Sequence, residues 1–129
     1  MRKLILFILL PILTACDPFV YMELYVQNNC DQSITVQGSA EHYPSTEFYI
    51  TIKPHSTELI YQCETINHIE KSDIPHFITS LNIVKEGEIF NANPLDTNRW
   101  TFEEITPYKF GKSHFRSKAT IFINSGDFE

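Results

Sequence analysis

Hydrophobic and polar residues alternate with a period of two along most of this chain. Between residues 19 and 26 the even positions are aliphatic, and the odd positions are aromatic or acidic. Such alternation is typical of a strand that buries one of its faces. The polar residues 28–32 then favour a turn, and apolar residues alternate with polar ones again over residues 33–37. We therefore predict that the first two strands form a hairpin.

The same period predicts five further strands. We expect them at residues 48–53, 57–63, 77–85, 99–105 and 119–124. A tight turn is expected at Gly87. Residues 64–76 lack a clean alternation, so either a short helix or a packed loop is expected there, and Pro75 should end it. Residues 91–98 are predicted to be a loop.

About seven short strands with little helix favour a β-sandwich or a small barrel, and short connections favour antiparallel pairing. Two segments, 26–36 and 52–60, resemble the opening strands of immunoglobulin-like domains. The closing residues 119–123 are similar to the end of small all-β lipoproteins of unknown function from Gram-negative gut bacteria. These patterns and resemblances imply an all-β fold: a small antiparallel β-sandwich, immunoglobulin-like, of about seven strands, forming one domain over residues 19–129.

The amino-terminal segment has the build of a bacterial lipoprotein leader. Arg2 and Lys3 precede a ten-residue apolar run that is too short to span a bilayer, as in a secretory signal peptide. The run ends in Leu13-Thr14-Ala15-Cys16, which resembles the lipobox of bacterial lipoproteins at all four positions. The resemblance implies cleavage before Cys16, a thioether-linked diacylglycerol on its sulfur and an acylated amino terminus. The alternative is an ordinary signal peptide after which a cysteine happens to follow.

Cleavage would divide the chain into a helical signal peptide at 1–15, a lipidated cysteine with a short tether at 16–18, and the domain at 19–129. Only Asp17 and Pro18 separate the lipidated cysteine from the first strand, and this tether spans less than about 10 Å when extended. One acyl chain binds a membrane only marginally, whereas two or three anchor a protein stably. We therefore expect a domain that is exported from the cytoplasm and held close to a membrane of the cell envelope. Asp17 resembles a signal that retains some Gram-negative lipoproteins in the inner membrane, and the choice between inner and outer membrane stays open.

The charge balance excludes a nucleic-acid-binding protein. The chain has 10 Lys and Arg against 16 Asp and Glu, a net charge of −6, and loss of the leader would leave 8 basic residues against the same 16 acidic ones. Nucleic-acid binding would need a broad positive surface. Half of the remaining basic residues lie close together in the sequence, and they are Lys109, Lys112, Arg116 and Lys118. This stretch is either a patch that contacts anionic lipid or an acidic partner, at about 1 kcal/mol per cation, or a solvated turn of an acidic domain.

Two cysteines remain besides the lipobox cysteine. Export would place Cys30 and Cys63 in a compartment that permits disulfides. A bond between them would close a loop of about 34 residues and contribute about 2–4 kcal/mol. The alternative is a pair of buried free thiols that act as small apolar residues. No metal site is expected, because neither a C-x-x-C pattern nor clustered histidines accompany them.

The sequence carries no catalytic signature. Adjacent strand residues point to opposite faces, so Glu103 and Glu104 cannot act as a pair of carboxylates. With four glycines in all, loops that cradle phosphates are not expected. Tyr21 and Tyr25 lie on the face of the first strand that is opposite its aliphatic face. They either stack on a sugar or on a protein partner, or they fill a second buried face of the sandwich. We favour the buried face.

These observations predict a lipid-anchored cell-envelope protein with a binding or structural role. We expect no enzymatic activity and no cofactor. Its partners are the membrane, through the lipid on Cys16, and an envelope protein or a glycan. The alternatives are an inhibitor or immunity-type lipoprotein that occludes another protein, and a small hydrolase.

Overall fold

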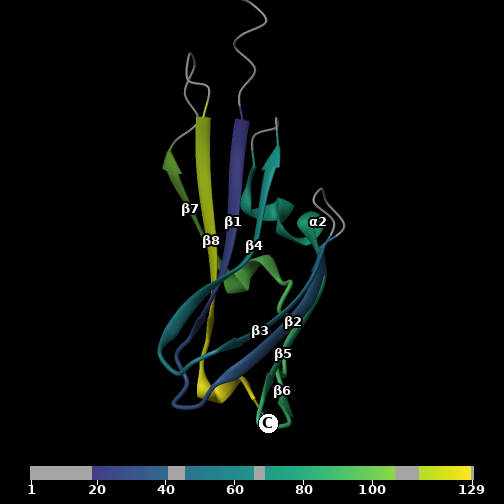
Figure 1. Ribbon diagram of the computed structural model, residues 1–129, viewed down its shortest axis with the longest axis vertical. Coiled ribbons are helices and arrows are strands. Elements are labelled where there is room, and N and C mark those ends of the chain that lie inside the picture. The colour runs from purple at the N-terminus through teal and green to yellow at the C-terminus, as the bar shows by residue number, and fades with distance from the viewer. Residues whose placement is uncertain (1–18, 41–45, 66–68, 107–113, 129) are drawn as a thin grey trace, which may run out of the picture.

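The computed structural model of this chain describes residues 19–40, 46–65, 69–106 and 114–128. These residues form two four-stranded sheets that pack face to face (Figure 1). The predicted architecture, a small all-β sandwich with little helix, is therefore confirmed.

The first sheet, called sheet A, has the strand order β4-β1-β8-β7. Its strands are β1 (Phe19–Asn28), β4 (Ser56–Thr65), β7 (Trp100–Thr106) and β8 (His114–Ile123). β1 is a central strand that pairs antiparallel with β4 and parallel with β8, and β7 pairs antiparallel with β8. The expected antiparallel pairing thus holds for every pair in the two sheets of the described chain except β1 and β8.

The second sheet, called sheet B, has the order β3-β2-β5-β6 and is antiparallel throughout. Its strands are β2 (Ile34–Ala40), β3 (Thr46–Ile52), β5 (Ile78–Lys85) and β6 (Glu88–Ile89). The predicted hairpin of the first two strands is wrong, because β1 and β2 belong to different sheets. This order also differs from an immunoglobulin constant domain, where the second strand pairs with the first and the fifth; here β2 pairs with β3 and β5.

A single buried side chain marks the place where the chain crosses from sheet A to sheet B. The Asn28 amide nitrogen donates to the backbone oxygens of Gln32 at 2.8 Å, Ile52 at 3.1 Å and Lys53 at 3.2 Å. Its side-chain oxygen accepts from the backbone N–H of Cys30 at 2.9 Å. These bonds hold the turn that follows β1, and they connect the end of β1 to the end of β3.

The core is filled by the inward faces that the alternation predicts. All four aliphatic residues of β1 at even positions are buried, and Ala119, Ile121 and Ile123 of β8 join them. Trp100 begins β7 inside the core, and its indole N–H donates to the backbone oxygen of Pro94 at 2.8 Å. A buried indole needs such a partner, because an unpaired polar group costs free energy in an apolar interior.

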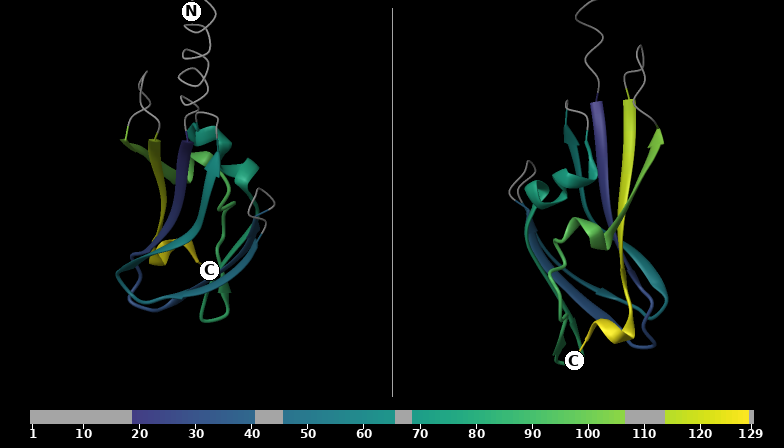
Figure 2. Two further views of the ribbon diagram at one scale, coloured as in Figure 1. Left: turned by 45° about the horizontal axis from the view of Figure 1, so that its top comes forward. Right: turned by 180° about the vertical axis from the view of Figure 1, so that it is seen from behind.

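A short helical segment closes one end of the core. It comprises η1 (Lys71–Asp73) and α2 (Ile74–Phe77) and lies beside the upper part of sheet A, above sheet B (Figure 2). The buried side chains Ile74 and Phe77 anchor it. Of the two expectations for this region the short helix is therefore correct. Pro75 stands in the first turn of α2 rather than ending it, since a proline at a helix start removes no intrahelical hydrogen bond.

The turns and strand ends match the sequence to different degrees. Glu86 and Gly87 both have positive φ, 48° and 82°, as a two-residue hairpin turn between β5 and β6 requires, so the tight turn at Gly87 is confirmed. Residues 91–98 form a loop, as predicted, and η2 (Thr97–Arg99) lies at its end. Another short helical turn, η3 (Ser125–Asp127), follows β8. β8 begins at residue 114, five residues earlier than predicted, because Phe115 and Ser117 continue its buried face.

Candidate functional site

The predicted site residues that the structure describes do not lie together at one place. Cys16, Lys109 and Lys112 lie outside the described residues. Arg116 and Lys118 lie two residues apart on β8 and point away from sheet B, on the outer face of sheet A. The described half of the basic stretch is therefore part of a strand.

The two remaining cysteines are free thiols, and both are buried. Cys63 lies opposite Met22 near the start of β1, whereas Cys30 follows the other end of that strand. From Met22 to Asn28 the strand extends about 20 Å at 3.3 Å per residue, and a disulfide needs Cα atoms within about 7 Å. The predicted disulfide is therefore not formed, and the alternative of two buried thiols is correct. Burial raises the pKa of the Cys63 thiol to about 11.

Charged and aromatic side chains form a network on the outer face of sheet A, called here the charged cluster: Glu23, Tyr25, Arg116 and Lys118. The Glu23 carboxylate accepts a hydrogen bond from Arg116 Nε, a second from Arg116 Nη2 at 2.9 Å, and a third from the Tyr25 hydroxyl. The Lys118 Nζ atom lies 4.6 Å from the centroid of the Tyr25 ring, in cation–π geometry. The cluster therefore joins β1 to β8 through side chains as well as through the backbone.

Electrostatics inside the charged cluster favour the ionised carboxylate. The hydrogen bonds from Arg116 hold the pKa of Glu23 below its ordinary value, against the opposing effect of burial, and the bond from Tyr25 adds to the lowering. The same bond, made by the neutral phenol, raises the pKa of Tyr25. A carboxylate held in its ionised form by a guanidinium is poorly suited to exchange protons near neutral pH. The cluster is best explained as a cross-strand ion pair.

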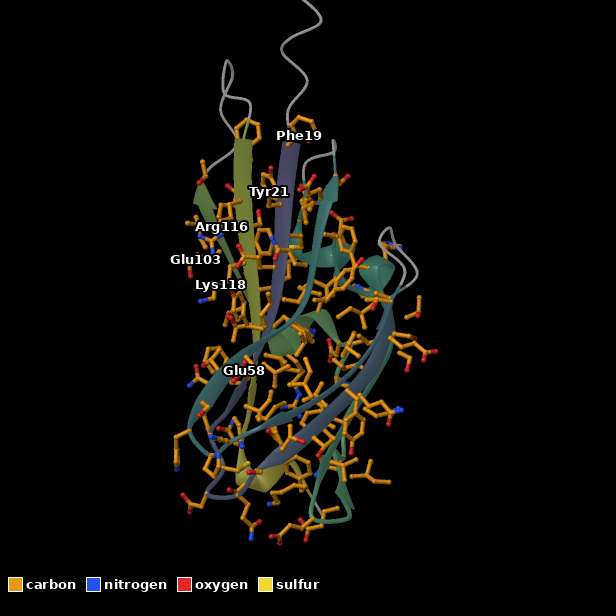
Figure 3. All side chains as sticks on the ribbon, viewed as in Figure 1. Phe19, Tyr21, Glu58, Glu103, Arg116 and Lys118 are labelled. Atoms are coloured by element: carbon orange, nitrogen blue, oxygen red, sulfur yellow. The ribbon has the colours of Figure 1, made fainter. Side chains whose placement is uncertain are left out.

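The exposure of the two tyrosines on the outer face of sheet A corrects the prediction that they are buried. Tyr21 and Tyr25 are partly exposed, so they do not fill a second buried face. Figure 3 places Tyr21 and Phe19 near the start of β1, with Arg116 and Lys118 beside them on β8 and Glu103 on β7. Glu103 lies opposite Lys118 in the β7–β8 register, whereas Glu104 lies opposite Ser117, as expected for neighbours in a strand.

A groove of about 410 Å³ lies on the outer face of sheet B. This polar groove is lined by Gln37, Gly38, Ser39, Glu47, Phe48, Tyr49, Ser80 and Asn82. The strand register arranges its outward side chains in two rows across β3, β2 and β5. The first row is Tyr49-Gln37-Asn82, and the second is Glu47-Ser39-Ser80.

The polar groups of the groove are largely unpaired within the part of the chain that the structure describes. In the described chain the side-chain amides of Gln37 and Asn82 and the hydroxyl of Ser80 have no hydrogen-bonding partner, whereas Ser39 shares a 3.2 Å hydrogen bond with Thr79. Tyr49 is 70% exposed. These side chains are therefore solvated and available to a ligand.

A glycine forms the floor of the polar groove. A Cβ atom at Gly38 would lie 2.4 Å from the backbone oxygen of Ser80 and 2.6 Å from the ring of Phe48. Only glycine therefore permits β5 and the Phe48 ring to approach β2 this closely. No sequence pattern predicts this groove. The local indication in the sequence is an aromatic residue, Tyr49, at an outward position of an alternating strand.

In comparisons with known proteins, no family model matches the chain, and no curated protein or solved structure shows significant similarity to it. Among the described residues, no helix is long and apolar enough to cross a membrane. The same residues contain no group of three or more His, Cys, Asp or Glu side chains that is arranged to hold a metal ion.

Proposed function

We propose that this protein is a lipid-anchored binding protein of a bacterial cell envelope, held at the membrane by acyl chains on Cys16. The observation that carries the proposal is the complete lipobox, Leu13-Thr14-Ala15-Cys16, directly behind a short apolar run. Two or three acyl chains on one residue supply enough apolar burial for stable anchoring, at about 0.8 kcal/mol per buried CH₂.

The position of β1 in the fold supports a closely held domain. β1 starts three residues after Cys16 and is paired on both sides along almost its whole length. Its first residue lies at one end of the sandwich, whose long axis β1 follows (Figure 1). With a tether shorter than about 10 Å, that end stands against the bilayer, and the far end of the ten-residue strand stands about 30 Å away.

The polar groove supports a binding role rather than a purely structural one. Its exposed tyrosine and its amides, which have no partner in the described chain, lie on sheet B, whereas the strand that follows the proposed anchor belongs to sheet A. An anchor at the start of β1 therefore leaves the outer face of sheet B open to the compartment. Orienting a few polar groups in a concave surface is how proteins commonly build a ligand site.

A second candidate function is the occlusion of another protein by an inhibitor or immunity-type lipoprotein. It is favoured by two partly exposed apolar side chains on the outer face of sheet A, Leu59 and Phe122. They lie opposite Tyr25 and Gln27 of β1, on either side of that strand. Apolar and aromatic side chains of this kind are enriched at the centres of protein interfaces.

Mass spectrometry of the full chain, made in a Gram-negative host and extracted from membranes, tests the proposal. We expect a product that lacks residues 1–15 and carries diacylglycerol and a further acyl chain on Cys16. The variant Cys16→Ala should retain its leader and incorporate no labelled palmitate, whereas Cys30→Ala should be lipidated normally. An unmodified thiol at position 16, or an uncut leader, refutes the anchored protein. Cross-linking in intact cells then separates the two roles, since a single protein attached through Leu59 or Phe122 favours occlusion.

A further inference from the structure

We propose that the polar groove of sheet B is a carbohydrate-binding site that takes one or two sugar rings of an uncharged glycan. The inference rests on the proposed binding role and names its ligand class, but it does not depend on the lipid anchor. It is carried by the row Tyr49-Gln37-Asn82, where the register of three strands places an exposed aromatic ring in line with two amides that have no partner among the described residues.

The dimensions of the groove suit a small saccharide. Neighbouring strands lie about 4.8 Å apart, so each row extends about 10 Å across β3, β2 and β5. The two rows are two residues apart along the strands, which is about 7 Å. The volume of about 410 Å³ falls within the range of small-molecule sites, roughly 300–1,000 Å³. One or two pyranose rings lying on the sheet would cover both rows.

The hydrogen-bonding groups suit hydroxyls. Each side-chain amide, of Gln37 and of Asn82, offers both a donor and an acceptor. A sugar hydroxyl is likewise both donor and acceptor, so neighbouring hydroxyls of one ring can bond to the oxygen and nitrogen of one amide. The Ser80 hydroxyl, unpaired in the described chain, adds a third such group beside Asn82. The Glu47 carboxylate can accept from two adjacent hydroxyls at once.

The charge of the described lining disfavours anionic ligands. Among the described residues, this lining contains one carboxylate, Glu47, and no lysine, arginine or histidine. A phosphate or sulfate group would meet like charge without a compensating cation. Since the other polar groups are amides and hydroxyls, the ligand that matches them is an uncharged polyol.

Tyr49 completes the match because a pyranose has an apolar face as well as a polar rim. The ring is 70% exposed at one end of the first row. A tyrosine presents a broad apolar surface with a polar tip and loses little conformational entropy on binding. Packing of sugar C–H groups on this ring would bury apolar surface, while Gln37 and Asn82 bond to the hydroxyls beside it.

The test measures glycan binding by the full chain, purified in detergent micelles, on an array of uncharged di- and oligosaccharides of glucose, galactose, mannose and N-acetylglucosamine. Sulfated and phosphorylated forms of the same sugars are included as probes. We expect at least one uncharged probe to bind, and Tyr49→Ala and Asn82→Ala each to weaken its binding at least tenfold. The matched controls Ile89→Ala, an exposed apolar residue of β6, and Gln62→Ala, an exposed amide of β4, should change binding less than twofold.

Three outcomes overturn the carbohydrate site: no uncharged probe binds, only anionic probes bind, or binding is unchanged in Tyr49→Ala and Asn82→Ala. Both substituted residues are exposed, so the variants should unfold at the wild-type temperature, and this is measured on the same samples. The mass of the same purified chain reports the lipid on Cys16 independently. A lipidated protein that binds no sugar thus refutes the ligand class alone, and a sugar-binding protein without lipid refutes the anchor alone.

Discussion

Replacement of Asn28 by alanine should destabilise the fold more than any exposed polar substitution, because this side chain holds the crossing between the two sheets. Asn28 is fully buried and makes four hydrogen bonds to backbone groups. Asn28→Ala leaves the Ile52 carbonyl and the Cys30 N–H without their partner. Both of these bonds are buried, whereas the bonds to Gln32 and Lys53 are partly buried.

The magnitude follows from the number of buried groups left unpaired. Each buried donor or acceptor without a partner costs about 1–3 kcal/mol, and each partly buried bond contributes about 0.5–1.5 kcal/mol. Water can reach the partly buried carbonyls, so we expect a total loss of about 3–5 kcal/mol. A domain of this size is typically stable by about 5–15 kcal/mol, so Asn28→Ala removes a large share of the folding free energy.

Urea unfolding of the full chain in detergent, followed by tryptophan fluorescence, measures this loss. The signal is suitable because the single tryptophan, Trp100, is buried beside the core residues of β8. The matched control is Asn29→Ala, which removes the same side chain one residue later. There it accepts a partly buried bond from Gln27 at 2.7 Å and donates an exposed bond to Asn124 at 3.2 Å. We expect a loss of about 1 kcal/mol for the control, because neither bond is buried. Equal losses for the two variants would show that the side chain of Asn28 does not hold the crossing.

Two further substitutions and one chemical titration probe the sheet faces and the thiols. The lowered pKa of Glu23 means that its ionised form stabilises the fold above the ordinary value of 4.5, and that this contribution is lost as the pH falls through the lower folded value. Glu23→Gln should therefore lower the unfolding free energy at neutral pH and reduce its decline below about pH 4.5 in pH-dependent urea unfolding. Gly38→Ala should cost about 1–3 kcal/mol in the same assay, because the added methyl group meets the backbone oxygen of Ser80. A thiol reagent at mildly alkaline pH should not react with Cys30 or Cys63 in the native protein, since both are buried, and should react with two thiols per lipidated chain in denaturant.

Each of these measurements has a matched control or a contradicting outcome. Glu58→Gln removes an exposed carboxylate of β4 and should leave the pH dependence unchanged; equal effects of the two carboxylate variants would contradict the role of the charged cluster. Gly126→Ala adds a methyl group with no heavy atom within 4 Å, and a loss equal to that of Gly38→Ala would contradict the close approach of β5. No reactive thiol in denaturant would indicate a disulfide, whereas three would indicate an unmodified Cys16.

The sequence predicts the faces of the strands because alternation is a local property. The burial of Met22 and Leu24 and the turn at Gly87 follow from residues a few positions apart. Strand partners are not local: β1 pairs with β4 and β8, the latter about a hundred residues away along the chain. The predicted hairpin and disulfide fail for this reason. Each depends on which strands are neighbours, and period-two alternation carries no information about neighbours.

The sequence pattern does not predict the polar groove, for the same reason. Gln37, Tyr49 and Asn82 each look like an ordinary solvated position on its own strand. They become a row only when the β2–β3 and β2–β5 registers are combined. A candidate site made of one outward side chain from each of three strands has no sequence motif, whereas the proposed lipobox, Leu13-Thr14-Ala15-Cys16, is contiguous in the sequence.

The two outer faces of the sandwich differ in how the hydrogen bonds of their polar side chains are satisfied, and this difference supports the separate roles that we propose for them. On sheet A the Glu23 carboxylate, the Arg116 guanidinium and the Tyr25 hydroxyl bond to one another, so they stabilise the parallel pair of β1 and β8, a geometry slightly less stable per residue than an antiparallel pair. On sheet B, in the described chain, the Gln37 and Asn82 amides bond to no protein group and contribute little to stability. Polar side chains that contribute little to the stability of the fold, and that lie in a row beside an exposed aromatic ring, can instead bind a ligand. The strand that follows the proposed anchor is thus stabilised on the outer face of sheet A, whereas the proposed ligand site lies on sheet B.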